Sequence, residues 1–190
     1  CYTQFTMMDE AGKEIPMRAG GPWRPYSGFI LRELVADEAT ITIISVVAER
    51  SLFDEIGVFD EDNGIVFRED YDLLLRMAAC AKTVAVPQVL CRARDHAGRS
   101  TSQRDDFYDC SAKVFLKFGR LTTDPEIRRL CHRRGACHLV AAADRCIVTR
   151  SGNGAFRRLI RALRYYPLHG RWWIVFAKCL LSPILRRLRF

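Results

Sequence analysis

A short helix, an acidic loop and a second helix are predicted to follow one another between residues 56 and 76. Gly57 is the kind of residue that ends a helix, and the loop after it leads to the adjacent carboxylates Glu69 and Asp70. Apolar residues then recur at helical spacing, which predicts a helix over 69–80 with one buried face. Two carboxylates at the start of a helix have a fixed direction, and such an arrangement can hold a general base.

The same stretch carries a recognisable motif. Residues 57–61 read Gly-Val-Phe-Asp-Glu, and residues 69–73 read Glu-Asp-Tyr-Asp-Leu ahead of Arg76. Downstream, residues 90–96 end in Arg-Asp-His and are followed by two nearby serines. In this order and spacing, residues 2–102 resemble the GT-A glycosyltransferases, especially family 2, whose signature is Gly-x-Phe-Asp-Glu, Glu-Asp-x-Asp-Leu and an Arg-x-His loop with serines.

The resemblance implies an α/β fold for the first part of the chain, and the patterns after residue 102 predict two helical parts. We expect residues 1–102 to form the acceptor-side part of a GT-A domain, a fragment of its Rossmann-like mixed sheet. An all-helical C-terminal extension would follow. Within it, we expect residues 103–150 to form a helical hairpin packing on the first part, and residues 151–190 to form basic amphipathic helices at a membrane surface.

A complete GT-A domain also has a nucleotide-binding half that this chain lacks. In the family, that half ends in an Asp-x-Asp motif that holds a divalent metal against the sugar nucleotide. The chain starts at Cys1 without an initiator Met, so we interpret it as part of a longer enzyme and expect it to be inactive alone. The resemblance implies Mg²⁺ or Mn²⁺ in the full-length enzyme, with no tight metal binding by this portion.

Asp70 is the residue to which the resemblance assigns the chemistry. In an inverting transfer, the acceptor hydroxyl loses its proton as it attacks the anomeric carbon. A positioned carboxylate that takes this proton contributes roughly 100- to 10,000-fold to the rate. The alternative is that Asp70 and Glu69 only complement the positive end of a helix, as acidic side chains commonly do.

Other residues of the motif would bind the two substrates. Asp60, Glu61 and Glu69 are the candidates for acceptor binding, although a structural role for Asp60 and Glu61 in a solvated acidic turn is favoured. For the donor diphosphate the candidates are Arg94, His96 and Arg99, because cations offset the charge of the departing nucleotide. The resemblance also suggests His96 as a metal ligand. Asp72 is expected to face solvent or to pair with Arg76, four residues on.

Local patterns predict most of the remaining elements. Ser51 is a candidate cap for a helix over 52–56, and Asp124-Pro125-Glu126 has the composition of a helix start. The other predicted elements are strands at 2–8, 40–47 (buried), 83–86 and 89–94, and helices at 26–35, 103–118 and 155–165.

The net charge of +8 is concentrated in the tail. From Arg150 onward there are ten basic residues and no acidic one. Phe156, Leu159, Ile160 and Leu163 are predicted to line one face of a helix, with Arg157, Arg158, Arg161 and Arg164 on the other. The later apolar run is shorter than the roughly 20 residues that span a bilayer. We therefore expect the tail to lie on an anionic membrane surface; alternatively, its helix docks on its own protein. Nucleic acid is disfavoured because no reading motif accompanies the arginines.

The eight cysteines predict neither a disulfide framework nor a zinc site. They form no Cys-x-x-Cys pair, and Cys131-His132 and Cys137-His138 lie within one helical pattern, so packing is favoured over metal binding. Reduced thiols suggest a cytoplasmic protein, here peripheral to the inner face of the plasma membrane. The resemblance implies sugar transfer from a nucleoside diphosphate sugar to a hydroxyl acceptor in cell-surface polysaccharide or glycolipid synthesis. The alternative is a non-catalytic helical module that binds a membrane or a protein.

Overall fold

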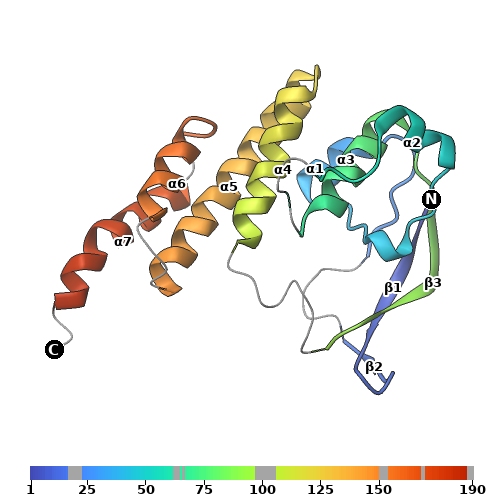
Figure 1. Cartoon of the computed structure of the whole chain (residues 1–190), viewed down its shortest axis with the longest axis horizontal. Coiled ribbons are helices and arrows are strands. Elements are labelled where there is room, and N and C mark those ends of the chain that lie inside the picture. Colours follow the sequence, from blue (N-terminus) through green and yellow to red (C-terminus); the bar gives the residue numbers. More distant parts are fainter. Residues whose placement is uncertain are drawn as a thin grey trace. The chain divides into compact units, whose positions relative to one another are not determined.

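The chain divides into two compact units, Cys1–Gln103 and Arg104–Phe190. The computed structural model describes residues 1–16, 23–61, 65, 67–96, 106–149, 154–167 and 170–187, with side chains to residue 181. Within these residues the structure is mixed α/β and mostly helical, with a three-stranded sheet and seven α-helices (Figure 1). The predicted helical hairpin and the predicted basic tail both belong to the second unit.

The sheet of the first unit has the order β2-β1-β3. The central strand β1, Tyr2–Met8, has the predicted bounds, and it pairs antiparallel with β2, Glu14–Ile15, and parallel with β3, Ala85–Arg94. The structure has one strand where two were predicted at 83–86 and 89–94. The pairing passes over Pro87, because Thr3 pairs with Val86 and Gln4 with Val89. A bulge of this kind accommodates a proline, which has no N–H to donate to the ladder.

The predicted buried strand at 40–47 is wrong. This segment contains a single turn of 3₁₀ helix, η1, Ile43–Ser45, and Val47 is 68% exposed. Only an isolated antiparallel bridge joins Val46 to Tyr2 of β1. β-branched residues fit a pleated surface but do not supply a partner strand, and here the pairing extends over one position.

The predicted helix at 26–35 is shorter and later than expected. Helix α1 runs over Leu31–Ala36 and ends at Asp37, whose φ of 67° is left-handed. Gly28, with φ of 96°, exchanges two 2.8 Å backbone hydrogen bonds with Thr83. Because of these bonds, the backbone at Gly28 pairs with the residues just before β3 and does not form a helix.

Helices α2, Arg50–Ile56, and α3, Glu69–Cys80, flank the acidic loop. Ser51 lies inside the first turn of α2 and does not cap it, since the capping position is Glu49, without a side-chain capping bond. Gly57 ends α2 as predicted, with φ of 74° and its N–H bonded to the Phe53 carbonyl. Helix α3 has the predicted bounds. Its buried face contains Leu73, Leu74, Leu75, Met77 and Ala78.

The second unit is a set of four packed helices. They are α4, Phe107–Leu121, α5, Pro125–Thr149, α6, Gly154–Leu163, and α7, Gly170–Arg187. Asp124 caps α5 as predicted, its Oδ1 accepting from the N–H groups of Glu126 and Ile127 at 2.8 and 3.2 Å. Residues 103–105, where a helix was predicted to start, lie outside the described residues, and α6 ends at Leu163, before the predicted residue 165.

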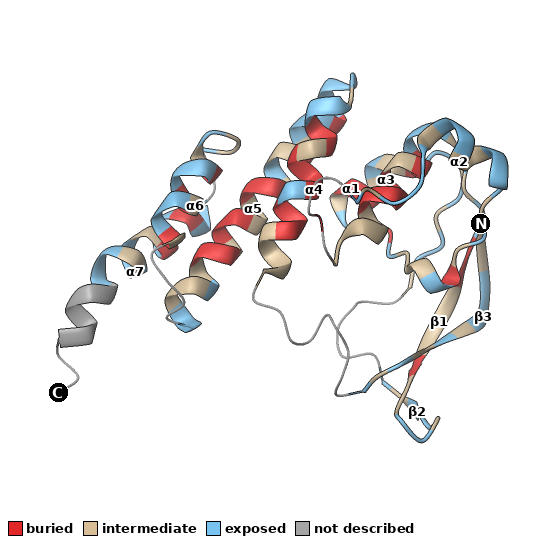
Figure 2. Cartoon of the chain, in the orientation of Figure 1, coloured by how far each residue is buried: buried red, intermediate tan, exposed pale blue. Residues whose placement is uncertain are grey.

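The core of this unit is continuous across all four helices (Figure 2). At the crossing of α4 and α5, a Cβ added to Gly135 would lie 2.6 Å from Leu116, so the absence of a side chain allows the two helices to approach. Trp172 of α7 donates its indole N–H to the Leu159 carbonyl of α6 at 2.8 Å. The buried core residues are Ala112, Leu116, Ala136, Leu139, Val140, Ala143, Ala155, Leu159, Ala162, Trp172 and Val175.

Candidate functional site

The candidate site of the first unit is the N-terminal end of α3. Phe67, just before the helix, has φ of 71°, a left-handed conformation that a bulky residue seldom adopts. The Arg68 guanidinium lies 4.4 Å from the centre of the Tyr71 ring, and the Tyr71 hydroxyl donates to the Leu34 carbonyl of α1 at 2.6 Å. These contacts place the first turn of α3 against α1. An unusual backbone conformation beside a helix start is compatible with a functional site.

Asp70 is half-buried in this first turn. Its Oδ1 accepts a 2.7 Å hydrogen bond from the Tyr71 N–H. Burial raises the pKa of Asp70 above its ordinary value, although the nearby Arg68 charge and the Tyr71 N–H act in the opposite direction. A higher pKa makes the ionised carboxylate a stronger base, and the role of Asp70 as a general base stays a prediction.

Glu69, next to Asp70, has an unusual carboxylate oxygen. The side chain is half-buried, and its Oε2 is shielded from solvent without a hydrogen-bond partner among the described residues. A shielded carboxylate oxygen is costly unless something donates to it.

Asp72 and Arg76 form a buried pair on the same helix. Asp72 is 1% exposed, and Arg76 Nε donates to its Oδ2 at 2.9 Å. The predicted pairing with Arg76 is therefore confirmed, whereas the alternative of a solvent-facing Asp72 is wrong, because the carboxylate lies within the core of the unit.

Arg76 also contacts the end of α2, which the sequence reasoning missed. Its guanidinium donates to the carbonyls of Ile56, Gly57 and Val58 at 2.7, 3.4 and 2.8 Å. The last carbonyls of a helix have no partners within the helix, so one arginine satisfies them and fixes where the acidic loop begins. Asp60, half-buried, and Glu61, exposed, lie in that loop. Their acceptor-binding role stays a prediction.

Among the described residues, none of the predicted diphosphate-binding side chains forms a hydrogen bond or ion pair with Asp70. Arg94 Nη1 donates to the carbonyls of Asp9 and Glu10 at 3.1 and 2.6 Å, so it binds the turn between β1 and β2. His96 is exposed, and Arg99 lies outside the described residues. A role for any of the three toward a diphosphate stays a prediction.

The expected packing role of the cysteine–histidine pairs agrees with their surroundings. Cys131 is buried where α4 and α5 meet, and burial raises the pKa of its thiol to about 12. His138 stacks on Phe115, with ring centres 5.5 Å apart. Across the described parts of the chain, no group of three or more His, Cys, Asp and Glu side chains could hold a metal ion. The metal role of His96 therefore stays a prediction.

A groove of about 750 Å³ lies elsewhere in the first unit. Its walls include the segment after η1, helix α2 and the second half of α3, with Val46, Leu52 and Met77 among the lining residues. Glu69 and Asp70 do not line it. The carboxylates of the motif and this groove are thus separate features.

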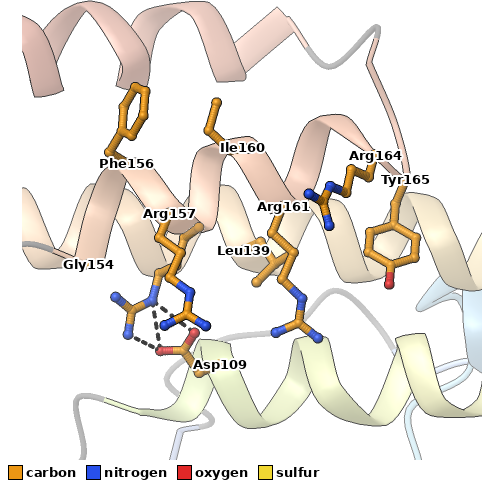
Figure 3. Close-up of a pocket in the computed structure, with 10 residues that line it drawn as sticks. Asp109, Leu139, Gly154, Phe156, Arg157, Ile160, Arg161, Arg164 and Tyr165 are labelled. Carbon is orange, nitrogen blue, oxygen red and sulfur yellow. Dashed lines mark hydrogen bonds and ion pairs between the residues drawn. The ribbon is translucent and has the colours of Figure 1, made fainter.

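A second concave site, which we call the arginine groove, lies in the helical unit. It has a volume of about 830 Å³ between α6 and α4, over Leu139 of α5 (Figure 3). Arg157, Arg161 and Arg164 line it as exposed side chains. The fourth arginine, Arg158, does not belong to an open basic face as predicted. It is half-buried and hydrogen-bonded to Asp109 of α4, at 2.6 Å in the shortest contact.

The apolar face predicted for α6 is divided in the structure. Leu159 is buried with Ala155 and Ala162, whereas Phe156 and Ile160 are partly exposed. Helix α7 likewise buries Trp172 and Val175 and leaves an apolar stripe in solvent, namely Trp173, Ile174, Leu180 and Leu181. Among the described residues, no helix has the length and hydropathy to cross a membrane.

Comparison with protein-family models, curated proteins and solved structures found no match to this chain. The resemblance to the GT-A glycosyltransferases rests on the motif residues alone and stays a prediction.

Proposed function

We propose that this chain is the acceptor-side part of an inverting GT-A glycosyltransferase similar to family 2, with Asp70 as the general base. The observation that carries the proposal is the state of Asp70: a half-buried carboxylate with a raised pKa at the first turn of α3. The sequence motif around it is the second support. Residues that only complement a helix end are usually solvated and need no raised basicity.

The proposed reaction transfers one proton, forms one bond to the anomeric carbon and breaks another. The acceptor hydroxyl oxygen attacks the anomeric carbon while its proton passes to Asp70, and the bond from that carbon to the nucleoside diphosphate breaks. The bonding electrons leave on the diphosphate oxygen. Oδ1 of Asp70 already accepts from Tyr71, so we assign the proton to Oδ2. Glu69, next to Asp70, would bind the acceptor and orient the nucleophile.

The test is Asp70→Asn in the complete enzyme. We expect kcat to fall by roughly 100- to 10,000-fold, with donor binding nearly unchanged. Asp54→Asn in α2, which changes an exposed carboxylate, is the matched control and should keep full activity. Asp70→Asn should not destabilise the fold, because it removes an ionised carboxylate whose pKa is raised in the folded state. Turnover at the wild-type rate in Asp70→Asn would remove Asp70 from the mechanism.

The pH dependence follows from the same carboxyl group. The base must be ionised, so kcat/KM should fall as the pH drops through the pKa of Asp70. Because burial raises that pKa, the acidic limb should lie above the pH at which an ordinary aspartate titrates. In Asp70→Asn the residual activity should lose this limb.

A second candidate, membrane-surface binding by the helical unit, is favoured by α7. Its exposed stripe contains Trp173 and Leu180, and the chain from Arg150 onward carries only basic charge, which is complementary to an anionic lipid surface. We expect Trp173→Ser with Leu180→Ser to weaken sedimentation with anionic vesicles by about tenfold or more. Val148→Ser, at an exposed apolar position in α5, is the control and should bind as the wild type does. Equal binding by all three would exclude α7 as the contact.

A further inference from the structure

The arginine groove combines a concave shape with unbalanced positive charge. Figure 3 shows Arg157 and Arg161 on the side of α6 that faces Asp109, with Phe156 and Ile160 on the opposite side. Leu139 of α5, which is 2% exposed, lies at its floor. An apolar floor lowers the local dielectric constant, so charges around it interact more strongly than in open solvent.

The acidic residue that lines the groove, Asp109, is paired with Arg158. Asp109 accepts three hydrogen bonds from Arg158, two from Nε at 2.9 and 3.0 Å and one from Nη2 at 2.6 Å. In this bidentate contact the two opposite charges offset each other, and the hydrogen bonds to Asp109 raise the pKa of Arg158. Arg158 is therefore a structural residue that joins α6 to α4.

The other three arginines retain their charge. Arg157 and Arg161 are four residues apart and Arg161 and Arg164 three apart, so they are neighbours on the helix surface, where like charges repel. Within the described part of the chain, none of the three forms an ion pair. Neither α6 nor α7 contains an acidic residue that could compensate them.

We propose that the arginine groove binds a phosphate group, as a phosphomonoester or a diphosphate. A guanidinium presents its N–H donors in a planar fork that matches phosphate oxygens bidentately. A carboxylate has two oxygens and satisfies one such fork, whereas a phosphomonoester has three terminal oxygens that adjacent arginines can share. The dianionic charge also relieves the repulsion along α6. This inference does not depend on sugar transfer at Asp70.

The first experiment measures binding of inorganic pyrophosphate to the whole chain by calorimetry at low ionic strength. We expect one saturable site in the wild type and at least about tenfold weaker binding in Arg157→Gln/Arg161→Gln, because two charge-assisted contacts are lost. The control is Arg120→Gln/Arg129→Gln, which removes the same charge from exposed positions of α4 and α5. It should bind as the wild type does. Equal weakening in the two pairs, or no saturable binding, would overturn the site.

A single substitution guards against a loss of structure in the double variant. Arg164→Gln changes one exposed side chain of the groove, and it should weaken pyrophosphate binding several-fold with an unchanged helical circular-dichroism spectrum. Unchanged binding in a folded Arg164→Gln and in a folded Arg157→Gln/Arg161→Gln would show that pyrophosphate does not occupy the groove.

The second experiment identifies the source of the phosphate. Vesicles containing phosphatidic acid present a phosphomonoester, and vesicles containing phosphatidylserine at matched charge present a phosphodiester. If the phosphate is borne by a lipid, the wild type should prefer phosphatidic acid, pyrophosphate should compete, and the preference should disappear in Arg157→Gln/Arg161→Gln. If the ligand is soluble, pyrophosphate should bind through the same arginines without any vesicle preference. A preference that survives in the double variant would contradict the groove as the site.

Discussion

The two compact units of the chain are stabilised by different kinds of interaction. In Cys1–Gln103, polar side chains join segments far apart in sequence, as when Tyr71 contacts the Leu34 carbonyl and Arg76 contacts the end of α2. In Arg104–Phe190, four helices share a continuous apolar core, and ion pairs such as Arg158–Asp109 lie at its edge. The first unit therefore adds individual polar contacts of this kind to its own apolar core, which includes Leu34 and Leu75, whereas the polar contacts of the second unit lie at the edge of its core.

Arg76→Met should have the largest effect and should fall on the first unit. It removes the charged partner of the buried Asp72 and three donors to the end of α2. Removing one member of a buried pair costs about 3–5 kcal/mol of unfolding free energy. Hydrogen exchange read by mass spectrometry should show lost protection in α2 and α3, with the second unit unaffected.

Two variants control this result. Arg32→Met alters an ion pair whose side chains are both about half exposed, and it should change the unfolding free energy by less than about 1 kcal/mol. Asp72→Asn added to Arg76→Met removes the buried charge and should recover part of the stability. If Arg32→Met and Arg76→Met were equally destabilising, the dependence of this unit on particular polar groups would be disproved.

Gly135→Val should have the next largest effect, confined to the second unit. A Cβ at this position would approach Leu116 to 2.6 Å within the α4–α5 contact. Overpacking of a dense core costs about 1–3 kcal/mol, which urea unfolding would detect. Gly170→Ala is the control, because a Cβ there meets no atom within 4 Å. A neutral Gly135→Val would show that this core tolerates added volume.

The smallest effect is expected at the ion pairs between α5 and α7. Asp144 accepts from Arg171 and Lys178 at 3.0 and 2.9 Å. Burial raises the pKa of Asp144, but the two hydrogen bonds outweigh it, so the pKa lies below its ordinary value. With a depressed folded-state pKa, the stabilisation is present at neutral pH and is lost as the pH falls from about 4 through the folded pKa.

Asp144→Asn should remove this acid-dependent contribution. Since both cations are about half exposed, we expect a loss of at most about 1 kcal/mol at pH 7. The difference from the wild type should vanish at low pH, which thermal unfolding across a pH series would measure. A difference that stays constant with pH would assign the loss to packing of α7.

Elements with strong local signals were predictable from the sequence. Helix α3 has both an acidic first turn and apolar residues at helical spacing, and its predicted bounds are correct. The start of α5 was equally clear, because Asp124 is a capping residue and Pro125 suits the first helical position. In both cases the information lies within a few neighbouring residues.

Elements decided by distant partners were not predictable. The β-branched residues at 40–47 have the composition of a strand, but pairing with Tyr2 occurs at one position. Residues before α1 have helical periodicity, yet Gly28 pairs with Thr83 instead. Propensity describes what a segment can form, and the availability of a partner determines what it does form.

The candidate site shows the same division. Glu69 and Asp70 at a helix start followed from local sequence, and so did the pairing of Asp72 with Arg76 at a spacing of four residues. The contact of Arg76 with the α2 carbonyls and that of Arg158 with Asp109 join residues about 20 and 49 positions apart. No local pattern encodes such contacts, so only the folded structure separates the structural arginines from those that line the arginine groove.

The parallel pairing of β1 with β3 has a consequence for how the chain is made. Tyr2–Met8 leaves the ribosome well before its partner Ala85–Arg94. Closing so long a loop costs entropy before any contact compensates for it. The helices of the second unit instead pack on neighbours in sequence. We therefore expect nascent chains to carry β1 with an open edge until β3 has been made, which makes this strand more dependent on chaperones than the helices of the second unit.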